Sequence, residues 1–133
     1  MDTPDPRYPI GAFASVGRAL SPDERRTRVE AIAAHPVRMR AAVAGLTDSQ
    51  LDTPYRDGGW TARQVVHHVA DSHMNSYVRF KLAITQDRPT ITVYDQDLWA
   101  EFEDAKHAPV DVSLAMLDAL HARWVAFLEG LSP

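Results

Sequence analysis

Three histidines and an aspartate lie within seven consecutive residues of this chain: His67, His68, Asp71 and His73. Neutral imidazole and carboxylate are ordinary ligands for zinc, nickel and iron, so the segment invites a metal-binding interpretation. Two ligands on one helix usually need a separation of three or four residues, whereas His68 and His73 are five apart and His67 and His68 are adjacent. The spacing alone therefore favours surface histidines with a single core histidine, and at most His68 shares a helix face with Asp71 or Ser72.

A capping box predicts that these residues lie on one long helix. Thr61 precedes Gln64 by three residues, so each side chain can accept a hydrogen bond from the other residue's backbone N–H at a helix start. Neither proline nor glycine follows before Pro89, which allows about seven turns at about 3.6 residues per turn.

The expected helix has an apolar side and a polar stripe when its residues are placed about 100° apart. His67 lies at the edge of the apolar side, and His73 lies within it. The polar stripe consists of Gln64, His68, Asp71, Ser72, Asn75 and Arg79. An ordinary solvated helix face explains that stripe as well as a functional one does.

Two more long helices are expected on either side of this one. Ser21 as N-cap, Pro22 at the first helical position and Glu24 completing a capping box predict a helix that extends to about Leu46. Pro36 lies inside that helix and predicts a kink near His35.

The last long helix is expected over residues 110–128, where apolar residues recur at helical spacing and Gly130 suits the C-terminal cap. Between the long helices, Thr47 to Gln50 repeats the capping pattern over a short piece. Residues 90–94 are expected to form a loop and residues 95–105 one short helix. Prolines and glycines in residues 1–20 predict an extended N-terminal arm.

Composition limits the class of protein. A length of 133 residues suits one domain, and a formal net charge of −4 argues against a nucleic-acid surface. No apolar run approaches the roughly 18 residues of a membrane span, so we expect a cytoplasmic protein. Because the chain has no cysteine, any metal must be held by histidine, carboxylate or water, and a catalytic cysteine is excluded.

Four segments resemble the YfiT branch of the DinB-like superfamily, and together they extend over nearly the whole chain. They are residues 8–11 (Tyr-Pro-Ile-Gly), 51–61 (Leu-Asp-Thr-Pro-Tyr-Arg-Asp-Gly-Gly-Trp-Thr), 65–75 (Val-Val-His-His-Val-Ala-Asp-Ser-His-Met-Asn) and 120–124 (Leu-His-Ala-Arg-Trp). The resemblance implies an all-α, DinB-like up-down bundle of four helices that binds a metal, with zinc or nickel as the expected ion. It also implies a hydrolase related to thiol S-transferases that use bacillithiol.

The resemblance further implies a ligand set of three histidines. One of them corresponds to His68, and the other two form a His-x-x-x-His pair on the family's last long helix, which this sequence lacks. We therefore consider His73 and His121 as possible substitute ligands. Asp71, Asn75 and Arg79, on the stripe with His68, are candidates to orient the ligand or to hold an anionic substrate.

The end of the sequence shapes two functional hypotheses. Residues 131–133 repeat the Leu-Ser-Pro of residues 20–22 that opens the first helix, so we expect a single DinB-like domain over residues 1–133 that is truncated before its last helix. The first hypothesis is a metal-dependent enzyme, either a hydrolase or an S-transferase whose partners are a small thiol and an electrophilic substrate. The second is a catalytically silent helical module that forms a homodimer through an uncovered apolar strip.

Overall fold

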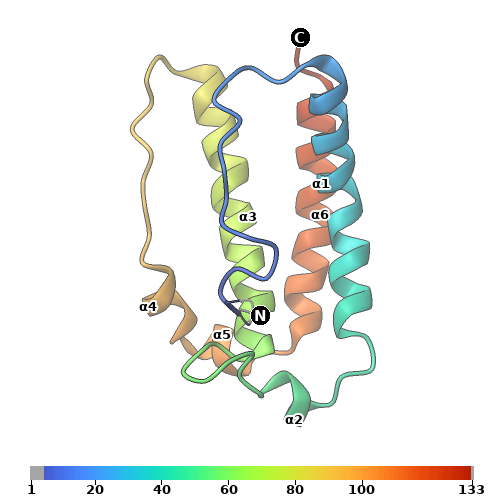
Figure 1. Ribbon diagram of the computed structural model, residues 1–133, viewed down its shortest axis with the longest axis vertical. Helices are drawn as coiled ribbons and strands as arrows, with labels where there is room; N and C mark the ends of the chain where they lie inside the picture. Colours follow the sequence, from blue (N-terminus) through green and yellow to red (C-terminus); the bar gives the residue numbers. More distant parts are fainter. Residues whose placement is uncertain (1–4, 133) are drawn as a thin grey trace.

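Three long helices dominate the computed structural model, which describes residues 5–132. They are α1 (Pro22–Val43), α3 (Ala62–Thr85) and α6 (Val110–Glu129), and the regular elements of the described residues are all helices (Figure 1). Three short helices lie near the end of the bundle where α3 and α6 begin: α2 (Asp48–Leu51), α4 (Gln96–Ala100) and α5 (Glu103–His107). The all-α bundle expected from the sequence is confirmed, but its long helices do not alternate up and down as expected, because α3 and α6 run in the same direction (Figure 1).

Helix α6 packs against both α1 and α3. Helices α3 and α6 run in the same direction and α1 runs opposite to both (Figure 1). The parallel arrangement is possible because residues 86–95 return along the outside of the bundle before α4, α5 and the start of α6. Side chains that are 44 to 51 residues apart in sequence therefore meet between α3 and α6.

All three capping boxes expected from the sequence are present. Ser21 pairs with Glu24 at the start of α1, Thr47 with Gln50 at α2, and the Thr61 side chain accepts from the Gln64 backbone at α3. Gly130 is the C-cap of α6, as expected. These features depend on residues close in sequence, which is why the pattern alone locates the helix ends.

Two segments test the finer expectations. Residues 90–94 contain no strand, so the prediction of a loop is confirmed. The single short helix expected over residues 95–105 is wrong, because the chain forms α4 and α5 there. The Asp95 side chain caps α4, and the helix stops after Ala100, so the chain turns before α5 begins.

The described part of the N-terminal arm, residues 5–20, contains no helix. Residues 1–4 of the arm and Pro133 lie outside the described residues. Helix α1 is continuous through Pro36, where the sequence predicts a kink. Within the described residues, no helix combines the length and the apolar character needed to cross a membrane.

The apolar core follows the buried side of α6. Leu117 has no exposed surface, and Leu114, Trp124 and Leu128 are also buried along that side. At the lower end, Leu51, Val66, Val110 and Leu114 form one cluster that joins α2, α3 and α6.

Candidate metal centre

Three histidines from three different helices converge in the middle of the bundle. His35 of α1, His73 of α3 and His121 of α6 each offer a ring nitrogen, and these nitrogens lie within 4.8 Å of one another. His73 Nδ1 and His121 Nε2 are 2.7 Å apart. The His35 and His121 rings stack with their centroids 5.1 Å apart. Among the described residues, this is the group of three or more metal-capable side chains that converges on one point.

Pro36 explains why His121 holds its orientation. Proline has no backbone N–H, so the helical hydrogen bond to the carbonyl four residues earlier is missing, and that carbonyl belongs to Ile32. His121 Nδ1 lies 2.6 Å from the Ile32 oxygen. Because a carbonyl oxygen only accepts, His121 Nδ1 must carry the proton. In the neutral ring, His121 Nε2 then carries a lone pair that is directed towards His73.

The surroundings lower the pKa of two of these imidazoles, His73 and His35. Burial lowers the pKa of His73 to about 4, and the neighbouring rings of His35 and His121 lower it further. Burial, followed by the proximity of His121, also lowers the pKa of His35. Trp124 packs edge-on against His73 and His121, at centroid distances of 5.8 and 5.4 Å. Neutral rings keep a lone pair available for a cation.

His68, the ligand implied by resemblance, lies apart from this group. Its ring packs against Trp60, with centroids 4.8 Å apart, and the side chain is half-buried. Burial lowers the pKa of His68, against an opposing effect of Asp97. Within the described residues, no group of three metal-capable side chains includes His68. The residues present therefore do not complete a metal site at His68.

The three other candidates on α3 have different surroundings. Burial, followed by the nearby charge of Asp104, raises the pKa of Asp71 above its usual value. Asn75 Nδ2 donates to the Asp71 backbone carbonyl, 2.8 Å away. Arg79 donates through Nη2 to the Thr92 carbonyl, 2.9 Å away, and so ties α3 to the returning loop.

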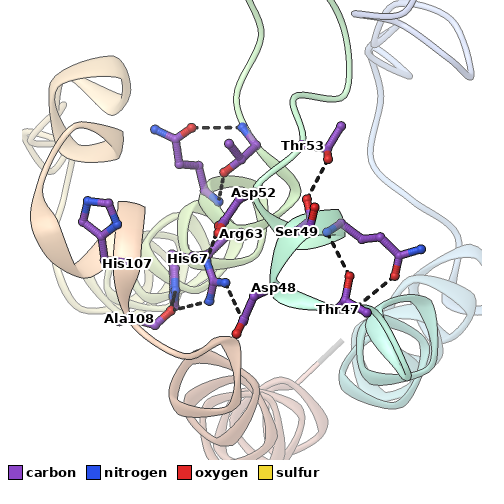
Figure 2. A network of polar contacts seen from close by, with 12 residues as sticks. Thr47, Asp48, Ser49, Asp52, Thr53, Arg63, His67, His107 and Ala108 are labelled. Atoms are coloured by element: carbon purple, nitrogen blue, oxygen red, sulfur yellow. Dashed lines mark hydrogen bonds and ion pairs between the residues drawn. The ribbon is translucent and has the colours of Figure 1, made fainter.

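A separate polar network fixes the start of α3, and Figure 2 shows it at close range. Arg63 is buried and donates to Asp52, at 2.7 Å, to Asp48, at 2.9 Å, and to the Ala108 carbonyl, at 3.1 Å. His67 Nε2 lies 2.9 Å from the same carbonyl, and its Nδ1 lies 2.6 Å from Ser113 Oγ. His67 is thus fully engaged in joining α3 to α6 rather than free to bind a metal.

Replacement of Arg63 by alanine is expected to lower the free energy of unfolding by about 2 kcal/mol. The lost charge-assisted hydrogen bonds contribute about 1.5–3 kcal/mol each. Part of that loss is offset, because alanine carries no charge that must be desolvated on folding. Asp48 is 89% exposed and is rehydrated in the variant. Urea unfolding measures the loss. Asp48→Ala, which leaves the Asp52 and Ala108 bonds in place, should cost under about 1 kcal/mol. Equal losses in the two variants would contradict the central role of Arg63.

The structure brings together two of the residues considered from the sequence and adds a third. His73 and His121, named as substitute ligands, are in contact. Sequence reasoning missed His35, whose ring meets those of His73 and His121 only through the packing of α1 against the other two helices. The buried pattern Leu114, Leu117, His121 and Trp124 at spacings of three and four could have indicated that His121 points inward.

Helical bundles can hold metal sites built from side chains of facing helices, and the three imidazoles from three helices form a group of that kind. The chain is a member of the DinB superfamily, whose sequence profile matches residues 31–133. The resemblance to YfiT proteins is confirmed by the relatives described next.

Two relatives in Bacillus carry the name "Putative metal-dependent hydrolase". The protein from Bacillus mycoides is 54% identical over 129 residues, which cover 97% of this chain and 73% of the relative. YfiT from Bacillus subtilis is 50% identical over 125 residues, which cover 94% of this chain and 70% of the relative.

A solved structure of Bacillus subtilis YfiT has the same fold. It superimposes with a TM-score of 0.93 at 49% identity, over 96% of this chain and 72% of that one. It is described as "a probable metal-dependent hydrolase with an unusual four-helix bundle topology". The parallel run of α3 and α6 in the present chain occurs within that shared fold.

Proposed function

We propose that this chain acts as a metal-dependent hydrolase or as an S-transferase of a low-molecular-weight thiol of the bacillithiol type, with His68 at the reacting side. The coarser part rests on membership of a family whose relatives are named as metal-dependent hydrolases. The finer part extends the resemblance of residues 51–75 to thiol-transferring members. A small thiol and an electrophilic substrate would be the partners, and zinc or nickel the ion.

The placement of His68 is the observation that carries the proposal. The imidazole is half-buried against Trp60 and is kept neutral by burial. A neutral imidazole can accept a proton or bind a cation, and an aromatic neighbour limits the access of water. Because the described residues do not complete a metal site at His68, no step of the reaction is assigned to an ion there.

Asp71, Asn75 and Arg79 of α3 differ in how well each could contact a substrate. Asp71, whose pKa is raised by burial, is suited to hold a proton at a higher pH than an ordinary aspartate. Arg79 already holds the Thr92 carbonyl through Nη2, yet its buried Nε has no hydrogen-bond partner among the described residues. That unused donor favours Arg79 over Asn75 as the contact for an anionic group.

The test is an activity assay of the chain loaded with zinc or nickel, using ester hydrolysis and thiol transfer to an electrophile. We expect activity that a chelator abolishes and that His68→Ala lowers about 100-fold or more, since loss of a side chain that transfers a proton in the reaction costs about 10²–10⁴-fold. His107→Ala, which removes an exposed histidine of α5, is the matched control and should retain the activity. Full activity in His68→Ala would contradict the role of His68.

Exposed apolar side chains favour the second candidate function, a silent dimerisation module. Val78, Phe80 and Ile84 of α3 are exposed. Phe80 and Ile84 line a groove of about 640 Å³ with Val29 and Leu128. Exposed apolar grooves of this kind commonly bind a partner. Absence of metal-dependent activity together with a dimer that persists on dilution in light scattering would support this candidate over the enzyme.

A further inference from the structure

We propose that His35, His73 and His121 form a binding site for one divalent transition-metal ion, separate from His68. Their ring nitrogens lie within 4.8 Å of one another, at the junction of α1, α3 and α6. The inference depends neither on the proposed activity nor on His68. It concerns only three side chains that the fold brings to one point.

The first argument is the contact between His73 and His121. His121 Nδ1 is occupied by the Ile32 carbonyl, so the neutral ring presents the lone pair of Nε2 to His73 Nδ1 at 2.7 Å. Without a cation, this contact requires His73 Nδ1 to carry its proton. With the proton of His73 on Nε2 instead, a bound cation would accept the lone pair of His73 Nδ1 together with that of His121 Nε2.

The second argument is the unpaired nitrogen of His35. Its Nδ1 is buried and has no hydrogen-bond partner among the described residues. Native structures rarely leave such a group without a partner, and a bound ion or water often accounts for one. The His35 ring lies 4.7 Å from the His73 ring between centroids, and one nitrogen of each ring belongs to the converging group.

The third argument is the shell that fixes the ligands. A metal-binding histidine commonly donates its other ring N–H to a carbonyl or a carboxylate, which sets the tautomer and the ring direction. The Ile32 carbonyl, freed by Pro36, provides that acceptor for His121. Trp124 packs against His73 and His121 and gives the site an apolar wall.

The geometry requires only modest ring movement. Zinc–nitrogen bonds of about 2.0–2.1 Å in a tetrahedral arrangement place neighbouring nitrogens about 3.3 Å apart. His73 and His121 must therefore separate slightly from 2.7 Å, and the widest pair must close from its present distance of at most 4.8 Å. Rotation of the rings about their side-chain bonds covers changes of this size.

The donor set defines the class of ion. Three imidazoles without a carboxylate or a thiolate suit zinc, nickel, cobalt and copper, and do not suit magnesium or calcium, which prefer oxygen ligands. Three ligands also leave a fourth position open for water or another small ligand. His35 and His73 are only half-buried, so an ion has a path to the site from solvent.

The test is titration of the metal-free 133-residue chain with cobalt(II) and zinc, followed by visible absorption and by elemental mass spectrometry after desalting. We expect one ion that is lost, with affinity lowered about 100-fold or more, in both His35→Ala and His73→Gln. His68→Ala and His107→Ala should bind that ion within about twofold of the unchanged chain. Circular dichroism would confirm that each variant remains folded.

Two outcomes would overturn the inference. One is absence of cobalt and zinc binding in the unchanged chain, which would make the cluster a set of packed imidazoles only. The other is binding that survives in folded His35→Ala and His73→Gln but disappears in His68→Ala. That second result would place the ion at His68 and would leave the proposed enzyme function intact, so the two proposals can fail separately.

Discussion

Replacement of Leu117 by alanine is expected to lower the free energy of unfolding by about 2–5 kcal/mol, the range for deletion of a fully buried leucine side chain. Leu117 has 0% of its surface exposed and lies on α6, the helix that packs against both α1 and α3. Its loss removes apolar burial and leaves a cavity that three packed helices cannot fully close. Urea unfolding, followed by circular dichroism, measures the change.

The neighbouring residue provides the control for this experiment. Met116 lies on the same helix and is 42% exposed. Methionine and alanine have similar helix propensities, so Met116→Ala should change the unfolding free energy by about 0.5 kcal/mol or less. If the two variants lost the same free energy of unfolding, Leu117 would not be part of the core of the bundle.

The helices could be predicted from the sequence because their start signals are local. Ser21 with Glu24 and Thr61 with Gln64 lie three residues apart, and each pair satisfies backbone donors without help from the rest of the fold. The segment 95–105 was harder. Its division into α4 and α5 depends on packing against α3, which no short window of sequence reports.

The three-histidine group could be predicted only in part. A helical wheel places His73 on the buried side of its helix, but it does not say which residue of another helix lies opposite. The contact with His121 follows from α3 and α6 running parallel, a property set by the long return of the chain between them. Sequence separation of 48 residues hides that relation.

Pro36 has a second consequence besides a possible kink in α1. Proline inside a helix indicates a kink, which is the feature that the sequence predicts at Pro36. The same missing N–H also leaves the Ile32 carbonyl in need of a donor, which His121 supplies. A buried carbonyl without its helical partner is therefore a reason to look for a polar side chain on the facing helix.

Replacement of Trp124 by alanine is expected to lower the free energy of unfolding by about 3–5 kcal/mol, as for other buried tryptophans. Trp124 is 5% exposed and packs edge-on against Phe80, with centroids 5.5 Å apart, as well as against His73 and His121. Its removal opens a cavity between α3 and α6 beside the histidines. Thermal and urea unfolding measure the loss.

Trp124→Phe separates the ring from its polar atom. The indole Nε1 is buried and has no hydrogen-bond partner among the described residues, so phenylalanine removes an unsatisfied donor while it keeps an aromatic contact with Phe80. The cost should therefore be about 1–2 kcal/mol, well below that of alanine. If Trp124→Phe lowered the free energy of unfolding as much as Trp124→Ala does, Nε1 would have a hydrogen-bond partner in solution. The next step would be to identify that partner.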